Sequence, residues 1–144
     1  MIGNNDNINW IGTSLEDYIS VKLEDKNSVN FYFTKSLLSI TEKKYPDFFD
    51  KEDNKYNLMV GFDEDNKKIL LGLSKKENIY TSAFTLNRDE NSFKGKPKKI
   101  TNQELRNFIE NSVKEDKFKL VDYDLELKDD DIIITFYLDS VVYY

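Results

Sequence analysis

The chain has 144 residues, 27 Asp and Glu against 21 Lys and Arg, a formal net charge of −6, and neither histidine nor cysteine. Without imidazole and thiol groups it lacks the commonest general base, the thiolate nucleophile and the usual zinc ligands, which argues against most hydrolase and metalloprotease mechanisms. Only Arg88 and Arg106 are arginines, and recognition of phosphate or guanine relies on arginine, so the composition argues against direct nucleic-acid binding.

The length fits one domain with its own core. Residues 1–17 are rich in asparagine and lack periodicity, so we expect an N-terminal arm followed by a single domain at 18–144. The start, MIGNNDNINWIG, lacks the basic flank and apolar core of a signal peptide, and no apolar run approaches the roughly 20 residues that cross a bilayer. These features predict a protein of the bacterial cytoplasm without membrane contact.

The first elements follow from alternation and capping. Apolar and polar residues alternate through 18–24 and again through 29–33, which predicts two strands joined as a hairpin. Thr34 is the expected N-cap of a short helix. Pro46 ends that helix, because proline disfavours helical geometry in the residue before it.

A second hairpin is predicted in YNLMVGFDEDNKKILLGL, residues 56–73. Apolar residues occupy both alternating sets, so we expect this hairpin to be central and covered on both faces. Its acidic tip, 63–67, has the Asp and Asn residues of a turn. A calcium loop needs a further oxygen ligand where Lys67 stands and a glycine that is absent, so we predict no metal site.

The next segments are a strand at 79–87, a basic stretch and a second helix. Thr101 with Glu104 has the spacing of a capping box and predicts the start of that helix. The basic stretch precedes it and is expected to be a loop that could contact phosphate. Its lysines are Lys94, Lys96, Lys98 and Lys99.

The end of the chain predicts two more strands. In 118–127 the apolar positions change parity near Val121, which a β-bulge would reconcile. The aromatic C-terminus is expected either to dock on the body or to form a partner surface. In all, the pattern predicts an α+β fold, mainly antiparallel sheet, with about seven strands and two short helices.

The order strand, short helix, strand, acidic turn and strand in VNFYFTKSLLSITEKKYPDFF…YNLMVGFDEDNKKILLGLSK resembles the swapped-hairpin modules of AbrB-like transition-state regulators. It is also similar to small uncharacterised proteins of phages and mobile elements in low-GC bacteria. The AbrB-like resemblance implies a homodimer that binds DNA through arginines. Here Asn30, Tyr32 and Lys35 stand in the first strand and helix start, without an arginine cluster.

Carboxylates are concentrated near the C-terminus. Asp122, Asp124 and Glu126 alternate on the predicted strand and should share one face. The resulting negative strip is either a solvated surface or an imitation of a phosphate track. The next three are expected in a turn, where charge also discourages edge-to-edge pairing. With the terminal tyrosines as aromatic anchors, the predicted partner-binding residues are Asp122, Asp124, Glu126, Asp129, Asp130, Asp131, Tyr143 and Tyr144.

We therefore expect a non-enzymatic binding module, without catalytic residues or cofactors, whose partner is a protein with a basic surface. A phage or mobile-element inhibitor of a host protein that handles nucleic acid, such as an anti-CRISPR protein, is one concrete form. The alternatives are an AbrB-like DNA-binding regulator acting as a dimer, and a structural component of a phage or conjugation apparatus.

Overall fold

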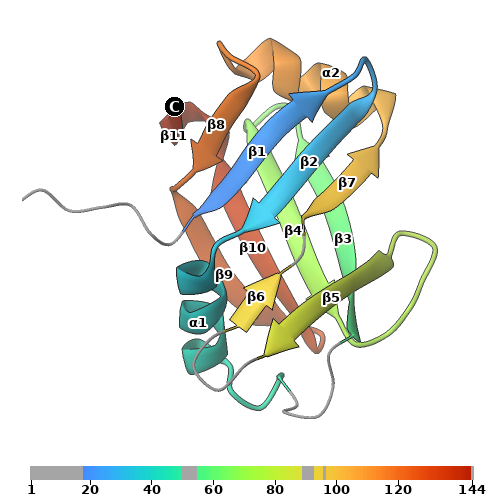
Figure 1. Cartoon of the computed structure of the whole chain (residues 1–144), viewed down its shortest axis with the longest axis vertical. Coiled ribbons are helices and arrows are strands. Elements are labelled where there is room, and N and C mark those ends of the chain that lie inside the picture. The colour runs from blue at the N-terminus through green and yellow to red at the C-terminus, as the bar shows by residue number, and fades with distance from the viewer. Residues whose placement is uncertain (1–17, 50–54, 89–92, 96, 144) are drawn as a thin grey trace, which may run out of the picture.

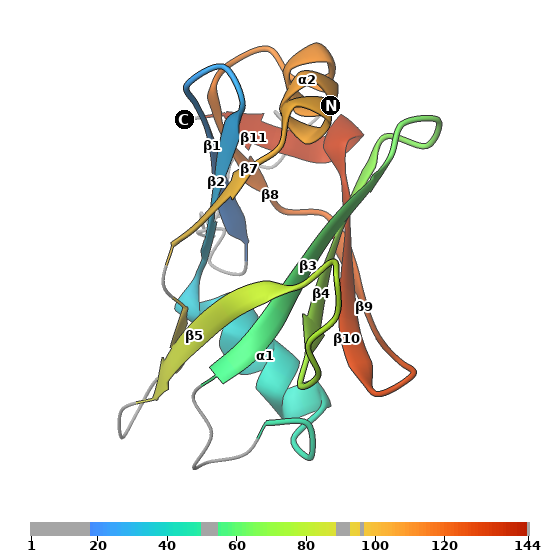
Figure 2. The same ribbon diagram turned by 90° about the vertical axis from the view of Figure 1, so that its right-hand side faces the viewer.

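The computed structural model describes residues 18–49, 55–88, 93–95 and 97–143, with 87, 88 and 93–95 described by backbone only. Two antiparallel sheets face each other (Figures 1 and 2). Sheet A has the strand order β11-β8-β1-β2-β7, and sheet B has the order β6-β5-β3-β4-β10-β9. The α+β, mainly antiparallel fold predicted from the sequence is confirmed, with more strands than expected.

The strands of sheet A are β1 Ile19–Glu24, β2 Ser28–Phe33, β7 Lys98–Thr101, β8 Lys117–Leu120 and β11 Val141–Tyr143. Those of sheet B are β3 Lys55–Asp63, β4 Lys68–Ser74, β5 Ser82–Arg88, β6 Phe93–Gly95, β9 Tyr123–Lys128 and β10 Asp131–Tyr137. The predicted first hairpin is β1–β2, and the predicted second hairpin is β3–β4.

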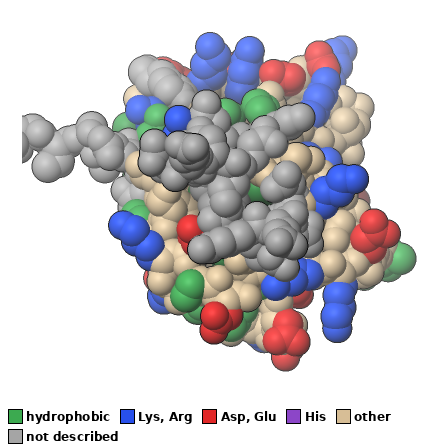
Figure 3. Space-filling view, turned by 60° about the horizontal axis from the view of Figure 1, so that its bottom comes forward, with side chains coloured by type: hydrophobic (Ala, Val, Ile, Leu, Met, Phe, Trp, Pro, Cys, Tyr) green, Lys and Arg blue, Asp and Glu red, His purple; other side chains and the backbone are tan. Residues whose placement is uncertain are grey.

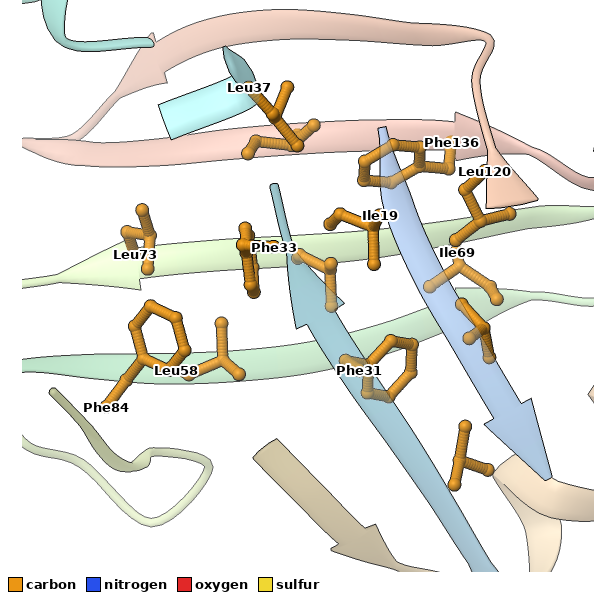
Figure 4. Packing of buried hydrophobic residues seen from close by; sticks show 14 of the residues in the cluster. Ile19, Phe31, Phe33, Leu37, Leu58, Ile69, Leu73, Phe84, Leu120 and Phe136 are labelled. Carbon is orange, nitrogen blue, oxygen red and sulfur yellow. The ribbon is translucent and has the colours of Figure 1, made fainter. Parts of the chain in front are cut away.

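The core lies between the two sheets, where the alternate apolar residues of facing strands meet (Figure 4). Ile19 and Phe31 of sheet A and Ile69 of sheet B are completely buried. The rings of Phe33 and Phe84 lie with their centroids 4.9 Å apart and tie β2 to β5. Each such side chain contributes about 1.5–3 kcal/mol through removal from water, so the alternation seen in the sequence is what holds the sheets together.

Helix α1, Lys35–Lys44, begins as predicted. The Thr34 hydroxyl accepts a hydrogen bond from the Leu37 amide at 3.3 Å, and the helix ends before Pro46. Leu37 and Leu38 are buried, and the helix closes one end of the space between the sheets (Figure 2).

Helix α2, Gln103–Ser112, lies at the opposite end (Figure 2). Its N-cap is Asn102, whose side chain accepts from the Leu105 amide at 2.8 Å, so the predicted capping box at Thr101 is wrong by one residue. Thr101 is instead the last residue of β7. The ring of Phe108 stacks on Phe62 of β3 with centroids 4.9 Å apart, which seats α2 on sheet B.

The predicted bulge near Val121 is wrong. The chain passes there from β8 in sheet A to β9 in sheet B through 121–122, and it returns through the 3₁₀ turn η2, Leu138–Ser140, to β11. The parity change has a simple cause: each strand turns its apolar residues towards the shared core from opposite sides.

Two further expectations are corrected. The strand predicted at 79–87 begins only at Ser82, because the Asn78 side chain accepts from the Tyr80 amide at 2.8 Å and holds a turn in which Ile79 is 88% exposed. The β3–β4 hairpin is central, but none of the described elements covers its outer face, where Met59 and Leu70 remain half-exposed. The predicted arm, 1–17, lies outside the described residues.

Candidate functional site

Three carboxylates are exposed at one edge of sheet B: Asp122 immediately before β9, and Asp124 and Glu126 within it. We call them the acidic strip. Asp124 pairs across the ladder with Thr135 and Glu126 with Ile133, so both carboxylates project from the outer face of the sheet. The structure therefore brings together the three residues that the alternation in the sequence placed on one face.

Tyr137 of β10 is bound to this strip. Its hydroxyl donates a hydrogen bond to an Asp124 carboxylate oxygen, and the Lys68 ammonium lies 5.4 Å from the centre of its ring. The hydrogen bond to Asp124 raises the pKa of Tyr137, with smaller contributions from partial desolvation and from the charges of Asp124 and Asp122. The neutral, hydrogen-bonding form of the Tyr137 hydroxyl is therefore favoured beside the strip.

Beside the strip, the outer face of sheet B is apolar and hollowed. A row of paired residues runs from Met59 of β3 through Gly72 of β4 and Ile133 of β10 to Glu126 of β9. We call the depression here the apolar hollow. It measures about 290 Å³ and is lined by Met59, Val60, Gly61, Leu70, Gly72, Tyr80 and Ile133.

The two glycines of the apolar hollow differ in the space that a side chain would find there. A Cβ at Gly72 would lie 2.9 Å from Met59 Cε and 3.3 Å from Ile133 Cδ1, so these two side chains lie over it. At Gly61 a Cβ would meet nothing within 4 Å. Sequence reasoning missed the hollow as a site because it expected this face to be covered; the available signal was glycine among apolar residues on both strands of one hairpin.

The other three predicted carboxylates, Asp129, Asp130 and Asp131, lie at the far end of β9, in the turn to β10 and at its first residue. Asp129 and Asp130 both have positive φ, 52° and 68°, the geometry of a type I′ turn. Together with Asp131 they border a hollow of about 370 Å³ that also contains Lys75 and Lys76, so the potential there is mixed rather than purely negative.

The acidic tip of the β3–β4 hairpin is a turn. Both oxygens of Asp63 accept hydrogen bonds from Asn66, from its side-chain amide at 2.8 Å and its backbone amide at 3.3 Å. The side-chain hydrogen bond is the largest cause of a lowered pKa at Asp63. Among the residues that the structure describes, no cluster of acidic groups is arranged to hold a metal ion.

The C-terminus docks on the body. Strand β11 pairs with β8, and the Tyr143 hydroxyl accepts a hydrogen bond from the Lys114 amide at 2.9 Å. Tyr143 therefore lies in sheet A, whereas the acidic strip lies on sheet B. Tyr144 is outside the described residues.

The predicted basic loop does not form one patch among the residues described. Lys98 donates to the Ala83 carbonyl at 2.9 Å, and Lys99 forms an ion pair with Asp25 at 3.3 Å. Lys94 belongs to β6 by its backbone, and Lys96 lies outside the described part of the chain. On the face in Figure 3, basic and acidic side chains are interspersed around the rim.

Arg106 has a structural role. Its side chain is almost buried and donates to Glu110 at 3.2 Å and to the Asp25 carbonyl at 3.1 Å. One of the two arginines of the chain is therefore engaged inside the fold rather than presented to a ligand.

Comparisons with family models, curated proteins and solved structures gave no match to this chain. None of the helices within the described ranges is long and apolar enough to cross a membrane.

Proposed function

We propose that the protein is a non-enzymatic binding module that uses the outer face of sheet B to hold a cationic segment of another protein. The observation that carries this proposal is the row of residues that leads from the apolar hollow directly into the acidic strip, with Ile133 paired to Glu126. A segment with an apolar side chain beside Lys or Arg would be complementary to both parts.

The two parts have different roles in binding. Exposed ion pairs contribute only about 0–1 kcal/mol each, so the strip alone would mainly accelerate encounter and select for positive charge. The apolar hollow offers an anchor site, because a side chain buried there loses water from both surfaces. Met59 and Ile133 at its walls are half-buried and can pack against such an anchor.

The partner class follows from the charge arrangement. Proteins that handle nucleic acid present grooves rich in Lys and Arg, and carboxylates spaced along a strand imitate the phosphates that such grooves bind. We therefore infer an inhibitor or modulator of a host nucleic-acid-handling protein in the bacterial cytoplasm, as an anti-defence protein of a phage or mobile element would be. The hydrogen bond of Lys98 to the Ala83 carbonyl and the engagement of Arg106 inside the fold give no support to the AbrB-like alternative, which binds DNA through arginines.

The proposal is tested by pull-down from a bacterial lysate with matched variants. Asp122→Asn with Glu126→Gln removes two charges from the strip and leaves the Asp124–Tyr137 hydrogen bond in place. The control, Glu115→Gln with Asp116→Asn, removes two exposed charges from the loop before β8. We expect the strip variant to lose the captured protein and the control to retain it.

A salt series completes the test. Capture should weaken as salt is raised, because the strip is exposed and screened. Equal capture by the strip variant, or a partner whose binding is insensitive to salt and to both variants, would rule the acidic strip out as the interface.

A further inference from the structure

The outer face of sheet A gathers lysines from three separate segments of the sequence. Lys22 of β1 pairs with Lys117 of β8 on one side and with Asn30 of β2 on the other. Asn30 in turn pairs with Lys99 of β7. A single row of paired residues thus carries three lysines across four strands that lie side by side in Figure 1.

The neighbouring row adds a fourth lysine and an aromatic ring. Lys119 of β8 pairs with Ser20 of β1, which pairs with Tyr32 of β2. Tyr32 is 42% exposed, and its neighbours along the strand, Phe31 and Phe33, are buried on the opposite face. We call Lys22, Lys99, Lys117, Lys119 and Tyr32 the basic face.

Among the described residues, the carboxylates nearby offset this charge only in part. Among the described strand residues on this side of sheet A, Glu24 is the only acidic one, and it lies 3.9 Å from the Lys22 ammonium. Asp25 in the following turn pairs with Lys99. Both lysines in these pairs are about half exposed, at 53% and 50%, and pairs of this kind exchange readily with another anion.

We propose that the basic face binds single-stranded nucleic acid. Lysines would contact the phosphates, and a base would stack on Tyr32, the combination by which open sheets hold single strands. A duplex fits poorly, because the major groove admits a helix or a two-stranded ribbon, whereas this face is wider. The acidic strip of a second copy fits poorly as well, because the face of an aromatic ring is itself negative and repels carboxylates.

This second surface is independent of the first. The basic face belongs to sheet A and the acidic strip to sheet B, so a partner protein and a nucleic-acid strand could be bound together. The composition argues against nucleic-acid binding because it averages the charge over the whole chain. Local potential, which depends on where the charges lie, is what a ligand encounters.

The test is fluorescence anisotropy with a labelled oligo-dT of about 20 nucleotides, titrated over about 50–200 mM salt. We expect saturable binding to the intact protein. Lys22→Gln with Lys117→Gln should weaken it about tenfold and reduce the salt slope by about 1.4, since each lysine contact to a single strand contributes about 0.7. Tyr32→Leu should weaken it about fivefold or more through lost stacking.

The matched control is Lys43→Gln with Lys76→Gln, which removes two exposed lysines from outside the basic face. It should bind the oligonucleotide like the parent protein. Absence of saturable binding at the lowest salt, or equal weakening by the control pair, would overturn the proposal. A third result would also overturn it: the protein binds no oligonucleotide but self-associates in sedimentation, and the double variant Lys22→Gln with Lys117→Gln abolishes that self-association. The basic face would then be a contact between two copies of this chain.

Discussion

Tyr137 donates its hydroxyl hydrogen bond to Asp124, two residues along from the position directly opposite Asp124 on β10. This diagonal contact joins a neutral donor on the inner strand to the acidic strip on the edge strand. It gives Asp124 a different role from Asp122 and Glu126, since only Asp124 is bound to its own sheet through this hydroxyl.

The hydrogen bond between Tyr137 and Asp124 predicts that the Tyr137 hydroxyl titrates at a higher pH than an ordinary tyrosine. Because Asp124 raises the pKa of Tyr137 above its ordinary value of 10.0, Asp124→Asn should lower it towards that value. Ultraviolet absorbance of tyrosinate measures this, and Tyr137→Phe identifies which transition belongs to Tyr137. An unchanged tyrosine titration in Asp124→Asn would show that the hydrogen bond does not persist in solution.

The same shift has a consequence for stability. A pKa raised by folding contributes stability that is complete below the unfolded value and is lost as pH rises through the folded value. The difference in unfolding free energy between the parent protein and Tyr137→Phe should therefore be constant below pH about 10 and shrink above it. Urea denaturation at several alkaline pH values provides the measurement.

At acidic pH, the turn at Asp63 gives a pKa shift in the opposite direction, downwards, and so a stability that is lost as pH falls. Asn66 lowers the Asp63 pKa below 3.8, so the associated stability is present above that value and is lost as pH falls through the folded pKa. Asn66→Ala should raise the Asp63 pKa towards its ordinary value. Carboxyl-carbon NMR titration follows this directly, with Asp65 in the same turn as an internal comparison.

A substitution in the type I′ turn between β9 and β10 should increase the stability of the protein. Asp130 has φ of 68°, a left-handed conformation that costs residues with a Cβ about 1–2 kcal/mol, whereas glycine adopts it freely. Asp130→Gly should raise the free energy of unfolding by about 0.5–1 kcal/mol after the greater chain entropy of glycine is counted. Asp139→Gly, at a residue without positive φ, is the control and should destabilise instead.

The two glycines of the apolar hollow should respond differently to substitution. Gly61→Ala places a methyl group in open space on a strand and should stabilise by about 0.5–1 kcal/mol. Gly72→Ala should gain less, because the end of Met59 must move away from the new Cβ. Thermal unfolding ranks the two variants, and a larger gain at Gly72 would contradict the packing described here.

A larger residue at Gly61 separates stability from binding. Gly61→Leu should fold normally and fill the apolar hollow, so the proposed partner should lose its anchor site. Capture from lysate compares this variant with Gly61→Ala, which leaves most of the hollow open. Full capture by Gly61→Leu would place the interface elsewhere.

Local patterns predicted most of the elements because the strands that form the core, such as β1 and β2, each turn one face towards it. The alternation around Val21 and Phe31, and the cap at Thr34, depend on nearest neighbours along the chain and were therefore visible in the sequence. The cap of α2 was misplaced because Thr101 and Asn102 are both good caps, and pairing of Thr101 with Ser28 in the sheet decides between them.

Features that depend on pairing between distant strands could not be predicted. The parity change at Val121 is equally compatible with a bulge or with a move to another sheet, and only the partners of β8 and β9 distinguish these. Likewise, Lys22 and Lys117 are far apart in the sequence, and the basic face exists only because β1 pairs with β8. The acidic strip was visible because its members are alternate residues of one short segment, 122–126, most of which is β9.

The passage of the chain between sheets at 121–122 bears on how the protein is made. Strand β1 needs β8 as its second neighbour, and the central strand β4 needs β10, so both sheets include strands from the segment 117–143. Neither sheet can be completed while that segment is still inside the ribosome. The core therefore stays unfinished until residues 117–143 have emerged, and a chain that stops before Lys117 would lack strands of both sheets at once rather than form a smaller folded fragment.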